Sequence, residues 1–200
     1  MVTWVRFATA REVFEAFPTV IDDVSSRPTD DPPLEYLRRL ADGPTPEDAI
    51  AFCAYVLPRR EAVWWACRCL RALAPSFTTA EAAALQAAED WVTEPEDERR
   101  VAAMSVGMKN DRKVPATWAA LAAAWSGGSM IDDGEYPVPA PPHLTAKAAR
   151  VAVLGALARV SARDRARQLN ACLDIGFGLV GESLTPDIPG TAGRNRGGRR

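Results

Sequence analysis

Apolar residues recur at helical spacing along almost the whole chain, while the period-2 alternation of a half-buried strand is nearly absent. Pro, Thr and Gly mark the starts and stops of the successive segments, and Ala is frequent enough within them to let helices pack closely. Only residues 2–7 alternate loosely enough to suggest a short strand. We therefore predict an all-α protein, an irregular multi-helix bundle of about eight to nine helices built from antiparallel helical hairpins. A short α-solenoid is the alternative, although no fixed repeat period is found.

The same start and stop signals set the expected boundaries. Pro46 falls at a first helical position, where its missing N–H costs nothing, and the acidic residues after Pro95 suit the first turn of a helix. N-terminal helices and a Pro-containing connector occupy 1–44, a main helical domain 45–182, and a Gly/Arg-rich tail, expected to be disordered, 183–200. The expected helices span residues 9–17, 34–41, 45–57, 59–74, 78–94, 95–107, 115–125, 144–160 and 161–181.

Composition excludes several classes of protein. The net charge of −2 and the pI near 5.6 argue against a nucleic-acid binder, which would show a strong basic excess. No run of eighteen apolar residues exists, so no membrane span is expected, and the first residues lack the apolar core of a signal peptide. We expect a cytoplasmic protein, whose four cysteines would be reduced.

Few residues are available for catalysis. His143 is the single histidine, which excludes any site that needs two imidazoles from one chain, and Cys67 and Cys69 point to opposite sides of one helix, so they cannot chelate a metal from it. The glycines of 176–181 superficially resemble a nucleotide-binding fingerprint but lack the strand that must precede it. We expect no cofactor and no metal. A Cys–His enzyme that uses Cys172 or Cys67 with His143 stays as a minor alternative.

The segment 127–143, called the strap below, departs most from the Ala-rich helical pattern. It carries an acidic turn, a Pro-rich stretch and then His143, directly before the next helix. Loops of this length are uncommon in compact domains and are often functional. Asp132, Asp133 and Glu135 could hold a cation, but they lack the ordered ligand spacing of a calcium loop.

One helix carries two adjacent tryptophans. Within 59–74 the apolar stripe omits Trp64 and Trp65, so the helix is apolar nearly all round. Such a helix is usually buried at the centre of a bundle. The alternative is an exposed aromatic pair beside Arg68 and Arg71, a composition typical of protein interfaces.

Three blocks of sequence resemble an uncharacterised family of small, Ala-rich bacterial proteins. The blocks are LPRREAVWWAC at 57–67, WAALAAAWSGGS at 118–129 and PPHLTAKA at 141–148, and the similarity covers roughly 46–181. Genes of this family tend to lie beside components of the type VI secretion spike. The resemblance implies an accessory role, such as an adaptor or chaperone for a spike or effector, and brings no catalytic residues with it.

The leading hypothesis is therefore a non-enzymatic protein that binds a secretion spike component or an effector in a groove bordered by the strap. An immunity protein that neutralises a neighbouring toxin is the alternative. The predicted partner-binding residues are Arg59, Arg60, Trp64, Trp65, Arg68, Trp125, Tyr136 and His143.

Overall fold

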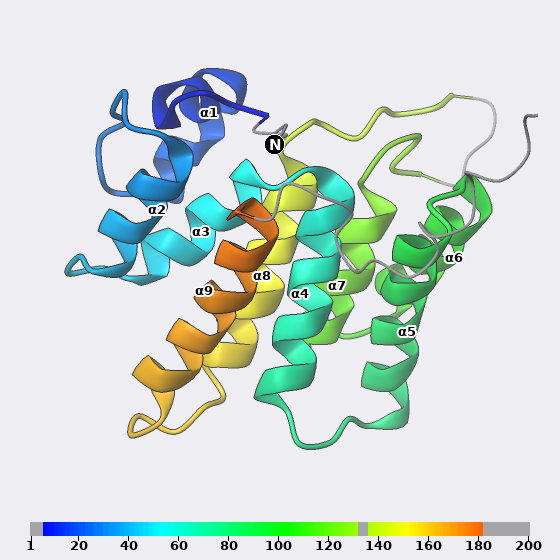
Figure 1. The fold of residues 1–200 in the computed structure, drawn as a ribbon. Coiled ribbons are helices and arrows are strands. Elements are labelled where there is room, and N and C mark those ends of the chain that lie inside the picture. The colour runs from blue at the N-terminus through cyan, green and yellow to red at the C-terminus, as the bar shows by residue number, and fades with distance from the viewer. Residues whose placement is uncertain (1–5, 132–135, 182–200) are drawn as a thin grey trace, which may run out of the picture.

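The computed structural model describes residues 6–131 and 136–181 and confirms the all-α prediction, with no strand in those ranges. Short connections place α4 and α5, and likewise α8 and α9, as antiparallel neighbours (Figure 1). The elements are α1 Ala10–Ala16, the 3-10 helix η1 Pro18–Asp22, α2 Pro33–Ala41, α3 Glu47–Val56, α4 Arg59–Leu73, α5 Thr79–Thr93, α6 Asp97–Lys109, α7 Pro115–Ala124, α8 Leu144–Leu157 and α9 Arg165–Gly181.

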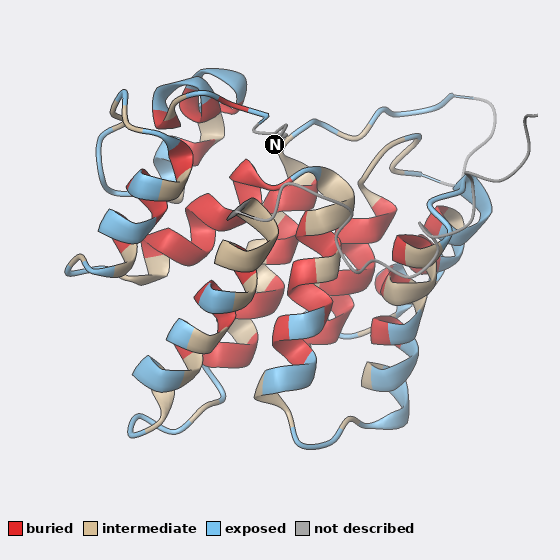
Figure 2. Cartoon of the chain, in the orientation of Figure 1, coloured by how far each residue is buried: buried red, intermediate tan, exposed pale blue. Residues whose placement is uncertain are grey.

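Four helices form the centre of the molecule. α4 packs against α5, α7, α8 and α9, while α7 and α8 pack against each other and α3 packs on α8. Figure 2 shows that α3, α4, α7 and α8 carry most of the buried residues. The helices α1 and α2 lie at one edge of this array, and α6 lies at the opposite edge, against α5 and α7 (Figure 1).

Large aromatic side chains and alanines divide the core between them. Tyr36 and Phe52 pack with Phe14 between α1, α2 and α3, and Tyr55 packs on Phe17 beside η1. The buried faces of α7 and α8, in contrast, are mostly alanine. Alanine has little bulk beyond the backbone, so these two helices can approach closely. One hydrophobic cluster runs from Phe7 to Leu173. The core is therefore continuous across residue 44, where the chain was predicted to divide, and that division stays a prediction.

Three local features differ from the prediction. The Pro-containing connector predicted within residues 1–44 begins with a short 3-10 helix, η1, and α6 continues past Gly107 to Lys109. Gly107 faces Leu121 so closely that an added Cβ would lie 2.8 Å from the leucine Cδ2, so this glycine is a packing residue and not a helix end. α8 ends before Ala158 and α9 begins only at Arg165.

No helix in the described part of the chain has both the length and the apolarity that a membrane crossing requires. The predicted strand near residues 2–7 lies largely outside the described residues, as do the acidic turn at 132–135 and the predicted disordered tail at 183–200.

Candidate functional site

The two arms of the strap are hydrogen-bonded to each other. The Met130 amide donates to the Val138 carbonyl (2.8 Å), and the Ala140 amide donates to the Gly128 carbonyl (3.2 Å). Between them, Ser129 and Pro139 form an isolated antiparallel bridge. The Ser129 hydroxyl oxygen also accepts from the amide of Val138 at 3.1 Å. The strap therefore has a defined backbone where its arms meet, although it is not a regular strand pair.

The side chain of Arg100, on α6, holds this backbone in place by hydrogen bonds. Its side chain is buried, and its Nη1 donates to the carbonyls of Ala124 (3.2 Å) and Ser129 (2.9 Å), while its Nε donates to Asp97 Oδ1 (2.7 Å). A buried guanidinium must be paired in this way, because an isolated buried charge is costly. Gly128 allows the approach: it has a φ of +59°, and a Cβ there would lie 2.8 Å from the Arg100 guanidinium carbon.

Two further hydrogen bonds hold residues 125 and 126, directly before the strap. Arg59, at the start of α4, donates from Nη1 to the Ser126 carbonyl (2.6 Å). Thr145, buried in the first turn of α8, donates from its hydroxyl to the Trp125 carbonyl (3.0 Å). Side chains from α4, α6 and α8 therefore satisfy the carbonyls that the end of α7 and the start of the strap leave open.

Exposed apolar side chains gather around this strap. Five large hydrophobic side chains of the described residues are exposed, and only Ile21 lies elsewhere, on η1. Single exposed apolar residues are normal on protein surfaces, whereas a group of them marks a contact site. The other four are Met108 (55% exposed), Ile131 (41%), Tyr136 (72%) and Val138 (46%).

An open groove of about 330 Å³ separates α6 from the first arm of the strap. Sequence reasoning did not identify its methionines, although three of the four methionines of the chain contribute to it. Methionine is flexible and polarisable, and it is frequent on surfaces that accept partners of varied shape. The groove is lined by Val101, Met104, Ser105, Met108, Lys109, Met130 and Ile131.

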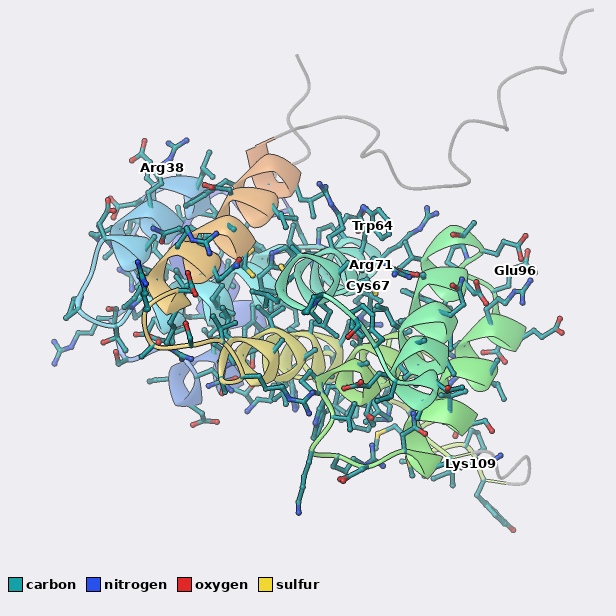
Figure 3. All side chains as sticks on the ribbon, turned by 90° about the horizontal axis from the view of Figure 1, so that it is seen from below. Arg38, Trp64, Cys67, Arg71, Glu96 and Lys109 are labelled. Atoms are coloured by element: carbon teal, nitrogen blue, oxygen red, sulfur yellow. The ribbon has the colours of Figure 1, made fainter. Side chains whose placement is uncertain are left out.

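Trp65 was predicted as a partner anchor, and this prediction is wrong. Its side chain is fully buried, and its indole N–H donates to the Cys172 carbonyl of α9 at 2.9 Å. Consecutive side chains of a helix point about 100° apart, so the neighbouring Trp64 points in another direction and is only half-buried against the core. The pair therefore divides: Trp65 joins α4 to α9, while part of Trp64 stays accessible near the surface of α4 (Figure 3).

The predicted rim arginines have different roles. Arg59 anchors the strap, and Arg60 donates to the Val92 and Thr93 carbonyls at the end of α5 (2.6 and 3.3 Å). Both are half-buried structural contacts. Arg68 is exposed on α4, as predicted for a rim residue, but it does not line the groove beside α6.

The remaining predicted residues lie along the strap and at its ends. Trp125 is half-buried and packs edge-on against Trp118, with ring centroids 6.4 Å apart. His143 is half-buried at the start of α8, where its carbonyl accepts from the Lys147 amide at 3.0 Å. Tyr136 is the most exposed of the set. Tyr136 is therefore exposed on the strap, and Trp125 and His143, near its two ends, are each partly exposed.

The buried thiols lie in the centre of the fold. All four cysteines are free and buried, and burial raises the pKa of Cys53, Cys67 and Cys69 well above the ordinary range of a thiol. Thiols in that state are poor nucleophiles. Within the described ranges, no three His, Cys, Asp or Glu side chains are grouped so that they could hold a metal ion.

Gly176 of α9 has a packing role. A Cβ on Gly176 would lie 2.5 Å from Cys53 Sγ and 3.2 Å from Trp65 Nε1. Gly176 is thus inside a helix that packs on α3 and α4, in an environment unlike that of a phosphate-binding turn.

A second cleft, of about 300 Å³, opens at the other end of the array. It lies between the ends of α4 and α8 and the starts of α5, α7 and α9. Its charged side chains already bond within the protein: Arg159 to Glu81 Oε1 (3.0 Å) and to the Lys113 carbonyl (3.0 Å), and Asp164 to Arg167 (2.9 Å). The strap side therefore remains the stronger candidate.

Comparison with protein-family models decides the family. Residues 36–180 match the model of a family of unknown function, DUF6931. The chain belongs to the DUF6931 family. The matched range, 36–180, contains nearly all of the range 46–181 over which the three sequence blocks show their resemblance. The elements α1 and η1 and the start of α2 precede the matched range. No curated protein and no solved structure matches the chain.

Proposed function

We propose that this DUF6931 protein is a non-enzymatic adaptor or chaperone that binds another protein through its strap. The observation that carries the proposal is the exposure of two strap side chains, Tyr136 (72%) and Val138 (46%). Hydrogen bonds from side chains of α4, α6 and α8 hold the backbone at and directly before the start of this strap. An apolar side chain on an anchored backbone loses little conformational entropy when a partner covers it.

The composition of the second arm of the strap supports this proposal. Residues 137–142 include four prolines, and all four are exposed to solvent. Proline fixes φ, so such a segment is already extended before it binds, as in other proline-rich recognition segments.

We propose the partner to be a type VI secretion spike component or an effector, met in the cytoplasm. This assignment rests on the family resemblance and its gene neighbourhood. A protein-binding surface is the kind of feature that an adaptor or chaperone requires.

The experiment is affinity purification of the tagged protein from its native cell, followed by mass spectrometry. Three forms are compared: wild type, Tyr136→Ala/Val138→Ala, and Ile21→Ala as a control. Ile21 is 70% exposed, close to the 72% of Tyr136, but lies on η1. We expect a spike component or effector with wild type and the control, and recovery at least about tenfold lower with the strap variant.

Two results would contradict the proposal. The first is a purification that enriches no secretion component, and the second is equal recovery by the strap variant and the control. Recovery of one toxin alone, together with rescue of cells from that toxin by co-expression, would select the immunity function instead.

A further inference from the structure

Beyond this proposed function, the exposed side of α6 has a pattern of charge that is complementary to itself. The side chains of Val101, Met104, Ser105, Met108 and Lys109 line the groove at spacings of three and four residues, which makes them one stripe of the helix. The same spacing extends the stripe back to Asp97 and Glu98 and forward to Arg112, just past the helix end.

The two ends of this stripe carry opposite charge. Glu96, Asp97 and Glu98 are exposed at the start of α6, and Lys109, Arg112 and Lys113 are exposed at or beyond its end. Figure 3 shows Glu96 and Lys109 at opposite ends of the helix. Among the described residues neither Glu98 nor Lys109 forms an ion pair, whereas the neighbouring Arg99 is already paired with Glu94 (3.1 Å).

We propose that the α6 stripe binds a second copy of this chain, with the two α6 helices antiparallel about a two-fold axis near Met104. Met104 lies six residues after Glu98 and five before Lys109, so an antiparallel copy centred there brings each Glu98 to the Lys109 of the other copy. The middle of the contact is then made by the half-buried Val101 and the exposed Ser105 and Met108 of each copy, above the buried Met104.

Symmetry favours this occupant over an unrelated partner. A two-fold interface uses the same patch twice, so the patch must be complementary to itself, as a stripe with acid at one end and base at the other is. Met108, the exposed methionine of the stripe, can adapt its shape to the surface of the other copy, whereas Met104 is buried beneath the interface. At a rise of about 1.5 Å per residue, Glu98 and Lys109 are about 16 Å apart along the axis, which leaves room for the apolar centre between the two ion pairs.

The position of α6 permits the contact. It lies at the edge of the helical array, packed on α5 and α7 through its inner side (Figure 1), and the first arm of the strap forms the other wall of the groove that the stripe lines. Tyr136 and Val138 do not line the groove, but Met130, which does, is hydrogen-bonded to Val138, so the partner surface proposed above lies next to the stripe. A dimer would carry two straps, and two linked binding sites increase the apparent affinity for any partner that can engage both.

The test is the oligomeric state of the purified full chain, measured by analytical ultracentrifugation and by light scattering after size exclusion. We expect wild type at twice the chain mass of 21.6 kDa. Glu98→Lys would set two lysine side chains against each other at each end of the interface, and Lys109→Glu would set two glutamates together there. Each variant should therefore be monomeric where wild type is dimeric, with a dissociation constant raised at least about tenfold.

Complementation in trans separates this geometry from simple loss of folding. An equimolar mixture of the two variants pairs opposite charges again in the mixed dimer, and the double variant Glu98→Lys/Lys109→Glu restores both ion pairs in a homodimer. Glu35→Lys, a reversal in the first turn of α2 at the far edge, is the control that should stay dimeric. A monomeric wild type, or a dimer that neither single reversal weakens, would overturn the proposal, whatever the purification from native cells recovers.

Discussion

Trp65 and Arg100 are both buried and both donate to carbonyls of other elements, but the regions around them are stabilised differently. Around Trp65 the backbone is helical, and the indole adds one hydrogen bond, to Cys172, within a dense apolar core. Arg100 lies where α7 ends and irregular backbone begins, and its guanidinium bonds the carbonyls of Ala124, the last residue of α7, and Ser129. Packing stabilises the centre, while a few polar side chains determine the shape of the strap. A change in the centre should therefore affect global stability, and a change at the strap should affect local order.

The largest effect is expected from Trp65→Ala. Removing a fully buried tryptophan costs about 3–5 kcal/mol, and here it also leaves the space against α9 unfilled. Trp64→Ala is the matched control at the next position and should cost about 1 kcal/mol, since that ring is only half-buried. Urea unfolding followed by circular dichroism measures both. Equal losses would show that the two tryptophans are not divided between core and surface.

Arg100→Met should have the second largest effect. Methionine keeps much of the apolar stem but leaves the Ala124 and Ser129 carbonyls without their donor, which we expect to cost about 2–3 kcal/mol. The distinguishing result is local: limited proteolysis should cut the strap well before the helices. A variant cut no faster at the strap than wild type would remove Arg100 from its assigned role.

Gly128→Ala should act in the same place with a smaller effect. The positive φ and the 2.8 Å approach to the Arg100 guanidinium both disfavour a Cβ, with an expected cost of about 1–2 kcal/mol. Gly127→Ala is the matched control, because an added Cβ there meets no atom within 4 Å. In thermal unfolding, Gly128→Ala should have a lower melting temperature than Gly127→Ala. A lower melting temperature for Gly127→Ala would contradict the account of the strap.

Much of the fold was predictable from the sequence because caps and breakers are local. Thr9 and Thr78 cap α1 and α5 by side-chain hydrogen bonds to the third helical residue, and these are signals that a sequence displays directly. Gly107 was misleading for the opposite reason. It resembles a helix end locally, but contact with Leu121 of the next helix requires a glycine inside α6.

The candidate site was only partly predictable. The length and composition of the strap identified it, and Tyr136 is as exposed as a binding residue should be. Tertiary contacts decided the rest: which of Trp64 and Trp65 is buried depends on where α9 lies. The groove methionines were missed because Met104 and Met130 are distant in sequence and meet only through folding.

The smallest effect concerns a polar contact outside both regions. Glu81 accepts hydrogen bonds from Thr78 and from Arg159. The bond from the Thr78 backbone amide contributes most, and the bond from the Thr78 hydroxyl contributes next, to lowering the pKa of the Glu81 carboxyl below its ordinary value of 4.5. Because the folded pKa is the lower one, the contribution to stability is complete above about pH 4.5 and is lost as pH falls through the folded pKa.

The Glu81→Gln variant tests this contribution. It should lose a small amount of stability near neutral pH and show a shallower fall than wild type in acid, because the titrating group is gone. Urea midpoints measured across the acid range for both proteins give the difference. Parallel curves for the two proteins would show that Glu81 does not contribute to the pH dependence.

The most direct test of the central claim, that the strap is an ordered surface held by its neighbours, is hydrogen exchange of the full chain. The amides of Met130 and Ala140 donate to carbonyls across the strap, so they should exchange well below the rate of an unstructured chain in wild type. In Arg100→Met both should lose protection, while amides of α4 and α8 keep theirs. Exchange of Met130 and Ala140 at the unstructured rate in wild type would contradict the claim.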